Sequence, residues 1–237
     1  MVAKKSLILG ISGSPRVSVT SKALDSALKA AESVPGITTM KIDLAGHDIS
    51  NCKNCNVCIN KNLDFCPVFK DDLKKEYYEM YKNCDGIILA TPIYHMTATG
   101  LIQNFLSRMK PLSQYARQGK FGSRMGAGIA VGGMRNGGQD FCLTVLNNML
   151  QSSGVNIIGG GVQFYNGAAV WSKNQKELND ENGILETQAL GRKLAYMCKV
   201  VQSGIDTLGE DINDANFLGF HNDEDLKQGY LNRGLDY

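Results

Sequence analysis

The sequence is poor in long apolar runs, in proline and in tryptophan, with five prolines and one tryptophan in 237 residues. Its longest strongly apolar stretch is GIILATPIY, Gly86–Tyr94, far shorter than the roughly 20 residues that a membrane-spanning helix needs. We therefore expect no membrane anchor. Lys4 and Lys5 precede a short LILGI run, but turn residues follow directly and no small-residue cleavage site closes a signal peptide. These absences indicate a cytoplasmic protein.

Several motifs are absent as well. The loop after the first apolar run contains neither G-x-G-x-x-G nor a Walker lysine, which argues against a dinucleotide fingerprint or a P-loop at that place. No basic run is interleaved with aromatic residues on one element, so we expect no nucleic-acid partner. The seven cysteines are an odd number, which in a cytoplasmic chain argues against a disulfide framework. The hydrophobic content of 43% is ample for a substantial core.

The net charge of +2 hides an asymmetry along the chain. From Asp206 onward there are eight acidic residues and only two basic ones, Lys227 and Arg233, which leaves 23 basic and 15 acidic residues before Asp206. A moderately basic body suits anionic cofactors or substrates, although lysine and arginine on a solvated surface are the commoner explanation.

Short apolar segments that read as buried strands alternate with segments of helical periodicity. The predicted strands are Ser6–Ser12, Thr38–Leu44, Asp85–Pro92, Gly126–Gly133 and Asn156–Phe164. The predicted helices are Thr20–Ser33, Lys74–Asn83, Gly100–Met109, Gln139–Ser152 and Glu186–Ser203. This alternation is typical of α/β proteins whose parallel sheet is covered on both faces. Five strands favour a flavodoxin-like, doubly wound five-stranded parallel sheet of order 2-1-3-4-5 over a barrel, which needs eight.

Three details complete the predicted organisation. Asp71 or Asp72 is expected to cap the helix that starts at Lys74. Residues 165–183, with Trp171, read as a long loop. The acidic C-terminal extension, 206–237, reads as irregular, yet it carries the aromatic residues Phe217, Phe220, Tyr230 and Tyr237. These are too many for a purely solvating segment, so we expect the extension to dock on the body or on a neighbour.

The loop after the first strand has the composition of an anion site. Its sequence, SGSPRVSVTS, supplies one guanidinium and a helix N-terminus with unpaired amides. The polar side chains in question are Ser12, Ser14, Arg16, Ser18, Thr20 and Ser21. Hydroxyls with an arginine suit a terminal phosphate dianion, as in flavin mononucleotide (FMN), better than a pyrophosphate diester. The alternative is a polar turn that caps a helix.

Two further loops are expected at the same edge of the sheet, because ligands of open parallel sheets lie at the carboxyl ends of the strands. In TPIYHMTATG, Pro92, Tyr94 and the backbone through Met96 have the chemistry to flank a planar ring. In GGMRNGGQ, the glycines permit close backbone approach, and Asn136 and Gln139 match the donors and acceptors of a flavin's polar edge. His95 is a candidate proton donor, although a lone loop histidine is more often merely solvated.

The cysteine-rich loop 51–70 has the spacing C-x2-C-x2-C-x7-C, formed by Cys52, Cys55, Cys58 and Cys66. Three cysteines at this pitch can surround three corners of an iron-sulfur cube, and the fourth would complete the ligation. Zinc bound by four thiolates and reduced, redox-reactive thiols are the alternatives. Because the loop follows the second strand, we expect it to emerge at the edge where the flavin is predicted. The other three, Cys84, Cys142 and Cys198, read as ordinary core residues.

The motifs GISGSPR, CPVFKDD, ATPIYHMTATGLIQNFLSR and VGGMRNGGQ together resemble the iron-sulfur flavoproteins. These belong to the flavodoxin-like NADPH-dependent FMN reductase superfamily, and the resemblance covers about residues 6–200. It implies bound FMN, a [4Fe-4S] cluster on the four cysteines and a homo-oligomer, dimer or tetramer, with flavins near subunit interfaces. It also implies electron transfer from a ferredoxin-like donor or NAD(P)H to a small acceptor such as oxygen, peroxide or a quinone.

The resemblance carries over site residues by position. Ser12, Ser14, Arg16, Thr20 and Ser21 would hold the FMN phosphate. Relatives commonly read Ser-Asn-Thr at 19–21, where this chain has Val-Thr-Ser, which shifts the phosphate toward Ser18. Pro92, Ile93, Tyr94, His95 and Met96 would flank the ring, and Gly133, Arg135, Asn136 and Gly138 would border its polar edge. Residues 1–205 would then be the FMN-binding domain, including the iron-sulfur loop.

The sequence thus predicts an FMN- and [4Fe-4S]-dependent oxidoreductase in which the flavin carries the chemistry and no side chain need act as acid or base. The first alternative is a cluster-free NAD(P)H-dependent FMN or quinone reductase. The second is a non-enzymatic redox sensor or binding module that uses zinc or its thiols.

Overall fold

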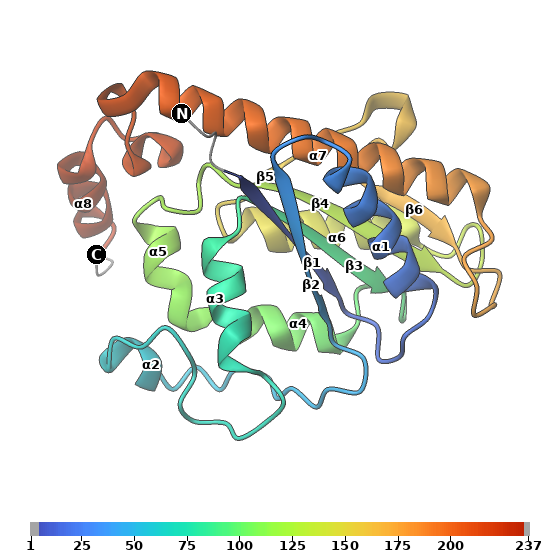
Figure 1. Cartoon of the computed structure of the whole chain (residues 1–237). Helices are drawn as coiled ribbons and strands as arrows, with labels where there is room; N and C mark the ends of the chain where they lie inside the picture. Colours follow the sequence, from blue (N-terminus) through green and yellow to red (C-terminus); the bar gives the residue numbers. More distant parts are fainter. Residues whose placement is uncertain (1–4, 235–237) are drawn as a thin grey trace.

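The computed structural model describes residues 5–234 as a parallel six-stranded sheet with helices on both faces (Figure 1). The strands are β1 (Ser6–Ser12), β2 (Ile37–Asp43), β3 (Gly86–Pro92), β4 (Met125–Gly132), β5 (Asn156–Ile157) and β6 (Ala168–Trp171). The α-helices are α1 (Val19–Glu32), α2 (Val57–Asn60), α3 (Lys75–Asn83), α4 (Gly100–Ser107), α5 (Ser113–Arg117), α6 (Gln139–Gln151), α7 (Glu181–Leu208) and α8 (Asp223–Asn232). Four short 3-10 turns, η1 to η4, are Lys110–Leu112, Gly161–Gln163, Gly209–Asp211 and Asp214–Leu218.

The sheet order β2-β1-β3-β4-β5 confirms the predicted flavodoxin-like topology. Successive side chains of the central strands point to opposite faces of the sheet and so form two separate hydrophobic cores. Ile8 packs with residues of α1 and α7 on one face, and its neighbour Leu9 packs with α3, α4 and α6 on the other. Because both faces are covered, these strands are almost wholly buried, which explains their continuous apolar runs.

The fifth strand is shorter than predicted. Only Asn156–Ile157 of the predicted segment Asn156–Phe164 is a strand, since the glycines at 159–161 have no side chains to pack on a sheet. A new strand, β6, forms within the segment that was expected to be a loop. β5 pairs with the beginning of β4 and β6 with its end, so two short strands share one edge position.

The predicted cap of α3 was also wrong. The helix begins after Lys74, which makes no side-chain cap. Asp71 instead accepts two hydrogen bonds from Arg108, one of them at 2.5 Å between Nη1 and Oδ2. Asp72 accepts from the amide of Asp48. Both carboxylates therefore hold the preceding loop rather than the helix.

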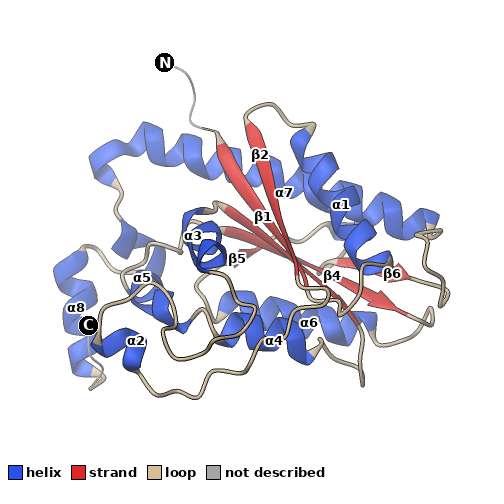
Figure 2. Ribbon diagram, turned by 60° about the horizontal axis from the view of Figure 1, so that its bottom comes forward, coloured by secondary structure: helices blue, strands red, loops and turns tan. Residues whose placement is uncertain are grey.

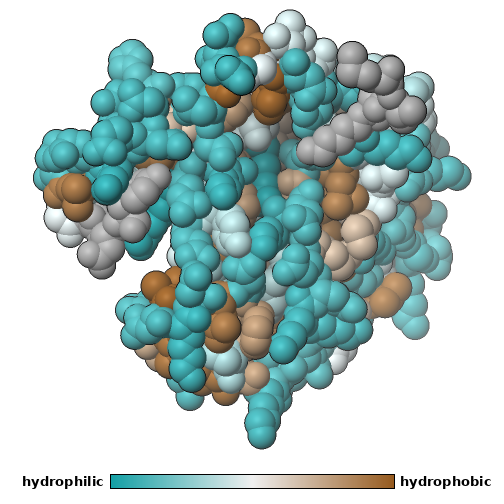
Figure 3. All heavy atoms as spheres, turned by 60° about the vertical axis from the view of Figure 1, so that its left-hand side comes forward, coloured by the Kyte–Doolittle hydropathy of each residue, from teal (hydrophilic) through white to brown (hydrophobic). Residues whose placement is uncertain are grey.

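The C-terminal extension is more regular than predicted. It contains α8, which Asn222 caps, and a turn that Asn213 caps by accepting from two amides. The extension docks on the body of the same chain: a Cβ at Gly122 would lie 2.4 Å from Cβ of Phe217. Figure 3 shows it as a projecting lobe with a mostly hydrophilic surface. Tyr237 lies outside the described residues.

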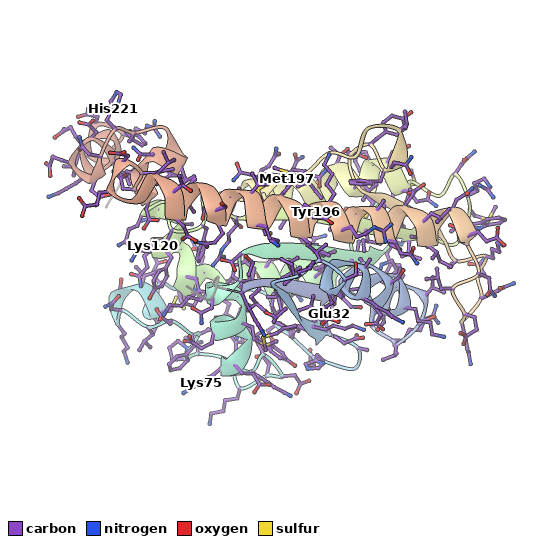
Figure 4. The ribbon with its side chains drawn as sticks, turned by 45° about the horizontal axis from the view of Figure 1, so that its top comes forward. Glu32, Lys75, Lys120, Tyr196, Met197 and His221 are labelled. Carbon is purple, nitrogen blue, oxygen red and sulfur yellow. The ribbon has the colours of Figure 1, made fainter. Side chains whose placement is uncertain are left out.

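Within residues 5–234, no helix combines the length and apolarity that crossing a membrane requires. The longest, α7, continues past residue 205 and leads directly into the extension. Figure 4 shows it running across the molecule above α1, with Tyr196 on the helix and His221 beyond its end.

The contact of α1 with α7 depends on a glycine. A Cβ at Gly191 would lie 2.0 Å from the carbonyl oxygen of Ala27, so the two helices approach as closely as their backbones allow. Gly191→Ala should therefore lower the free energy of unfolding by about 2–3 kcal/mol, despite the better helix propensity of alanine. Gly204→Ala, on the same helix with open space around it, should be neutral or stabilise by up to about 1 kcal/mol. Urea unfolding measures both, and equal stability of the two variants would contradict this packing.

Candidate functional site

A cleft of about 640 Å³ lies at the carboxyl ends of β1, β3, β4 and β6. Its volume is in the range of small-molecule and cofactor sites. Four loops line it, and the lining residues are Ser14, Arg16, Val17, Ser18, Val19, Thr20, Pro92, Ile93, Tyr94, Val131, Gly133, Ser172, Asn174, Gln175 and Lys176. Eight of the fifteen predicted cofactor-binding residues are in this set: Ser14, Arg16, Ser18, Thr20, Pro92, Ile93, Tyr94 and Gly133.

The loop after β1 presents free donors to the cleft. Ser18 precedes α1 without capping it, and no acidic residue stands in the first turn of the helix, so its amides are available to an anion. The Ser14 hydroxyl is engaged within the loop, since it donates to the carbonyl of Arg16 and accepts from the Arg16 amide. Ser12 does not line the cleft, but its buried hydroxyl lacks a hydrogen-bond partner. A phosphate group suits this donor set.

Ser21 faces away from the cleft. Its hydroxyl donates to Oδ2 of Asp43, at the end of β2, and accepts from Nζ of Lys41. Lys41 also pairs with Asp25 of α1, at 2.8 Å. Ser21 therefore joins the start of α1 to β2, and in this structure its hydroxyl is not free for a ligand.

The loop after β3 contains a strained turn beside the cleft. Tyr94 and Thr97 exchange two backbone hydrogen bonds, which leaves His95 and Met96 as a two-residue turn with φ of 49° and 67°. Glycine or asparagine normally occupies such positions. Neither residue lines the cleft. Met96 instead reaches the loop after β4, where a Cβ at Gly138 would lie 2.8 Å from its sulfur.

The loop after β4 is closed by Gln139, the first residue of α6. Gln139 accepts from the amide of Gly137 and donates to the carbonyl of Met134, so its amide is committed within the loop and not offered to a ligand. Arg135 lies 4.7 Å from the Trp171 ring. Of the predicted residues in this loop, Gly133 lines the cleft, and Arg135, Asn136 and Gly138 do not.

Sequence reasoning missed the segment Ser172–Lys176, which forms one wall of the cleft. It follows β6, and its base is closed where Asp180 accepts from the amide of Trp171 at 2.7 Å. An ion pair between Lys22 of α1 and Glu177 ties it to the opposite wall. The apolar run AAVW before a polar segment was the available signal, because it repeats the strand-then-loop pattern of the other cleft walls.

The four cysteines of the loop after β2 line one small cavity of their own, together with Val68, Phe69, Arg108 and other residues. Cys58 is buried, Cys52 and Cys66 are half-buried, and Cys55 is exposed. Burial raises the pKa of the Cys58 thiol. The remaining cysteines, Cys84, Cys142 and Cys198, are buried in the core as predicted.

Asparagines shape the cysteine loop. Asn54 and Asn56, which alternate with the first three cysteines, have φ of 55° and 58°, a region that asparagine tolerates better than most residues. The longer gap before Cys66 is closed by the short helix α2 and a hydrogen bond from Leu63 to the carbonyl of Cys58. Asp64 then pairs with Lys82 at 2.6 Å. The gap of seven residues thus brings the fourth cysteine to the cavity.

The four thiols line one cavity, and four thiolates are a donor set that fits an iron-sulfur cluster. Within residues 5–234, no group of three or more His, Cys, Asp or Glu side chains is arranged to hold a single metal ion.

The cysteine segment starts at the expected carboxyl edge, but its cavity and the cleft have no lining residue in common. The segment after β2 starts at the carboxyl edge but runs along α4, where Ile49 accepts from Asn104 and the amide of Cys52 donates to Ser107. The cleft lies near the other end of α4, where Thr99 donates to the carbonyl of Gly13. Since α4 has eight residues, it is about 12 Å long. Figure 2 shows α2 on the side away from the strands' carboxyl ends.

The fold and the cleft define a flavodoxin-like α/β protein with a second, cysteine-lined site. Its family follows from comparison: the family model for NADPH-dependent FMN reductase matches residues 6–168. The chain belongs to this family and is a flavin-dependent oxidoreductase.

Similar proteins carry the name iron-sulfur flavoprotein. One from Archaeoglobus fulgidus is 34% identical over 199 residues, which are 83% of this chain and 99% of that protein. Another, from Methanosarcina thermophila, is 29% identical over 205 residues, 84% of this chain and 98% of that protein.

Solved structures share the fold. A WrbA-like flavodoxin from Agrobacterium tumefaciens has a TM-score of 0.53 at 15% identity, over 83% of this chain and 99% of that one. An NADH:FMN oxidoreductase without its cofactor has a TM-score of 0.54 at 22% identity, over 84% and 90%.

The Arg108–Asp71 pair that holds the cysteine loop gives a pH-dependent prediction. Burial alone would raise the pKa of Asp71, but hydrogen bonds from Arg108 and the Ser50 amide outweigh it, and the pKa is lowered. Asp71→Asn should lower the free energy of unfolding at neutral pH by about 3 kcal/mol, because Arg108 loses its buried counter-charge. The difference from wild type should be complete above the ordinary pKa of 3.8. It should shrink as the pH falls through the lower pKa of the folded protein.

Urea unfolding at several pH values measures this difference. Glu76→Gln is the matched control, since the exposed Glu76 lies 3.7 Å from Lys74 and such pairs contribute at most about 1 kcal/mol. A loss in Asp71→Asn no larger than in this control would show that the buried pair does not stabilise the loop.

Proposed function

We propose that this chain is an iron-sulfur flavoprotein: an oxidoreductase that uses FMN in the cleft and a [4Fe-4S] cluster on Cys52, Cys55, Cys58 and Cys66. The observation that carries the proposal is that all four cysteines line one cavity in a chain of the FMN reductase family. When bound, FMN would exchange two electrons with a substrate and single electrons with the cluster. The chain's own residues would bind, orient and shield both groups.

The cleft residues divide into two sets by their chemistry. Ser14, Arg16, Ser18 and Thr20, with the amides of α1, would hold the phosphate. Pro92, Ile93, Tyr94 and Gly133 would flank the ring and its polar edge. Three of the predicted residues that do not line the cleft would support its walls: Met96 packs on Gly138, and Ser21 joins the start of α1 to β2.

Lys176 would be the second cation at the phosphate. It lines the cleft with Arg16, and no carboxylate is among the lining residues. Two cations match a phosphate monoester, which carries a charge of roughly −1.5 to −2 at pH 7. The nearby carboxylate of Glu177 is compensated by its pair with Lys22.

The partners follow from the same proposal. A ferredoxin-like protein or NAD(P)H would donate electrons in the cytoplasm, and a small molecule such as oxygen, peroxide or a quinone would accept them. The chain would form a homo-oligomer. Because the cleft and the cysteine cavity lie at opposite ends of α4, an oligomer offers a further way for a cluster to approach a flavin, from another subunit. The acidic extension, 206–237, would be an addition to an FMN-binding domain of residues 1–205.

Anaerobic purification tests the two cofactors together. The protein should contain FMN, iron and acid-labile sulfide, with about four iron atoms per chain, as a [4Fe-4S] cluster requires. Cys55→Ala should lose the cluster absorption in the visible spectrum and keep the flavin. Cys142→Ala, which changes a buried cysteine of α6 outside the cavity, should keep both.

The other outcomes are equally informative. FMN without iron would replace the proposal with a cluster-free reductase. Zinc without flavin would rule out both enzymes and favour a thiol-based sensor. Loss of FMN together with the cluster in Cys55→Ala would contradict the separation of the two sites.

Comparison of FMN with riboflavin tests the role of Lys176. Lys176→Gln should weaken FMN binding about tenfold at low salt, as the loss of one charge-assisted contact implies. It should leave riboflavin, which has no phosphate, within about twofold of wild type. Lys173→Gln is the control, because Lys173 lies over Trp171, 5.2 Å from the ring centroid, and does not line the cleft. Fluorescence titration of flavin-free protein with FMN and with riboflavin measures binding to wild type, Lys176→Gln and Lys173→Gln. An equal loss for FMN and riboflavin would remove Lys176 from the phosphate.

A further inference from the structure

Tyr94 is the aromatic side chain of the cleft. Of the lining residues within the described range 5–234, it alone has an aromatic ring, and the face of such a ring stacks on a planar group. The side chain is 46% exposed, so its own packing holds it weakly. Its position in the cleft therefore depends on the backbone on either side of it.

The stem of this loop is fixed on the sheet. The amide of Ile93 donates to the carbonyl of Val131 at 3.0 Å, directly after the last pair of β3 with β4, Pro92 with Val131. Tyr94 comes next and exchanges backbone hydrogen bonds of 3.0 and 3.1 Å with Thr97. The turn beyond Tyr94 has left the strand, so its tip needs a support of its own.

The tip of the turn has an unfavourable backbone. His95 and Met96 have positive φ, 49° and 67°, and neither is the glycine or asparagine that this region favours. Such a conformation persists only where the surroundings hold it. His95 is exposed, so the side chain of Met96 is the anchor available at the tip.

Met96 is anchored at Gly138. A Cβ at Gly138 would lie 2.8 Å from both the sulfur and the terminal methyl group of Met96, so the methionine occupies the space that a side chain at 138 would take. Gly138 is the N-cap of the 13-residue helix α6, and its carbonyl accepts from the amide of Cys142. The contact thus ties the tip of the turn to the start of a long helix.

We propose that Met96 is a positioning residue for the flavin ring: its contact with Gly138 fixes the turn, and the turn fixes Tyr94 against the ring. The inference rests on the proposed function, in which FMN occupies the cleft. In this role Met96 acts through Tyr94 and need not touch the flavin, since it does not line the cleft. A flexible, polarisable thioether suits a contact of this kind.

The place of this contact predicts which ligands are affected. Tyr94 belongs to the loop after β3, whereas Arg16 and Ser18, which would hold the phosphate, belong to the loop after β1. A disturbed turn should therefore weaken the binding of the ring whether or not the ligand carries a phosphate. FMN and riboflavin should lose affinity to the same extent.

Met96→Ala tests the proposal in flavin-free protein. Fluorescence titration should show dissociation constants for FMN and for riboflavin that are both about fivefold higher than those of wild type, a modest change for coupled neighbours. The fluorescence that remains at saturation should rise, because quenching of the flavin requires contact with the tyrosine ring. Met96→Leu, which keeps an apolar contact and the same backbone strain, should bind both ligands as wild type does.

Met134→Ala is the matched control. Met134 lies in the loop after β4, is 68% exposed and does not line the cleft, so its removal should leave both dissociation constants unchanged. Urea unfolding of flavin-free Met96→Ala should give the wild-type free energy of unfolding, because Met96 is itself 53% exposed.

Gly138→Ala tests the contact from its other side. The added Cβ should displace Met96 and weaken both ligands, and the strain at φ of 90° adds to this loss. In the Met96→Ala background the same substitution should cost less, because no sulfur remains to be displaced and the strain is common to both backgrounds. An equal cost in the two backgrounds would contradict the contact.

The remaining outcomes separate the inference from the proposed function. Wild-type affinity for both ligands in Met96→Ala would overturn the inference while FMN binding stands. A loss for FMN alone would assign Met96 to the phosphate, and a less stable flavin-free Met96→Ala would reduce it to a structural residue; each overturns the inference. A wild-type protein that binds neither FMN nor riboflavin would refute the proposed function itself.

Discussion

Burial of the Arg108 charge is the constraint on which the cysteine site depends. A guanidinium with 2% exposure must be compensated by nearby acceptors. Asp71 and the carbonyl of Ser50 provide them, and these two residues stand at the two ends of the cysteine segment. The compensation of one charge thereby closes a loop of about 20 residues whose own secondary structure is one short helix. The cysteines obtain fixed positions from an interaction in which none of them takes part.

Helix α4 connects this constraint to the rest of the molecule. Its N-cap, Thr99, accepts from the amide of Ile102 and donates to the carbonyl of Gly13 in the loop after β1. Its other end leads into Arg108. One short helix thus contacts the loop after β1, which lines the cleft, and leads into the wall of the cysteine cavity. Ile102 and Phe105, both fully buried, fix the helix on the sheet, so the relative placement of the two sites is set by the core.

The central strands, the larger helices and the sheet order could be predicted because continuous apolar runs and helical periodicity report burial directly. The short extent of β5 and the existence of β6 could not, since three glycines interrupt the pattern and the pairing of β6 with β4 is a long-range contact. The capping role expected of Asp71 failed for the same kind of reason: local propensity favours a cap, but a buried guanidinium far along the chain binds the carboxylate more strongly. The motifs indicated a phosphate loop and a cysteine site, whereas the wall that contains Lys176 and the position of the cysteines along α4 depend on packing.

The divided edge of the sheet has a consequence for solubility. An uninterrupted outer strand would present a long row of unpaired amides and carbonyls, to which a strand of another molecule can add. Here the outer position consists of β5, with two residues, and β6, with four, and the turn at Gly161–Gln163 lies between them. Neither piece is long enough to serve as a template by itself. The glycine-rich interruption therefore limits strand addition at this edge of the sheet.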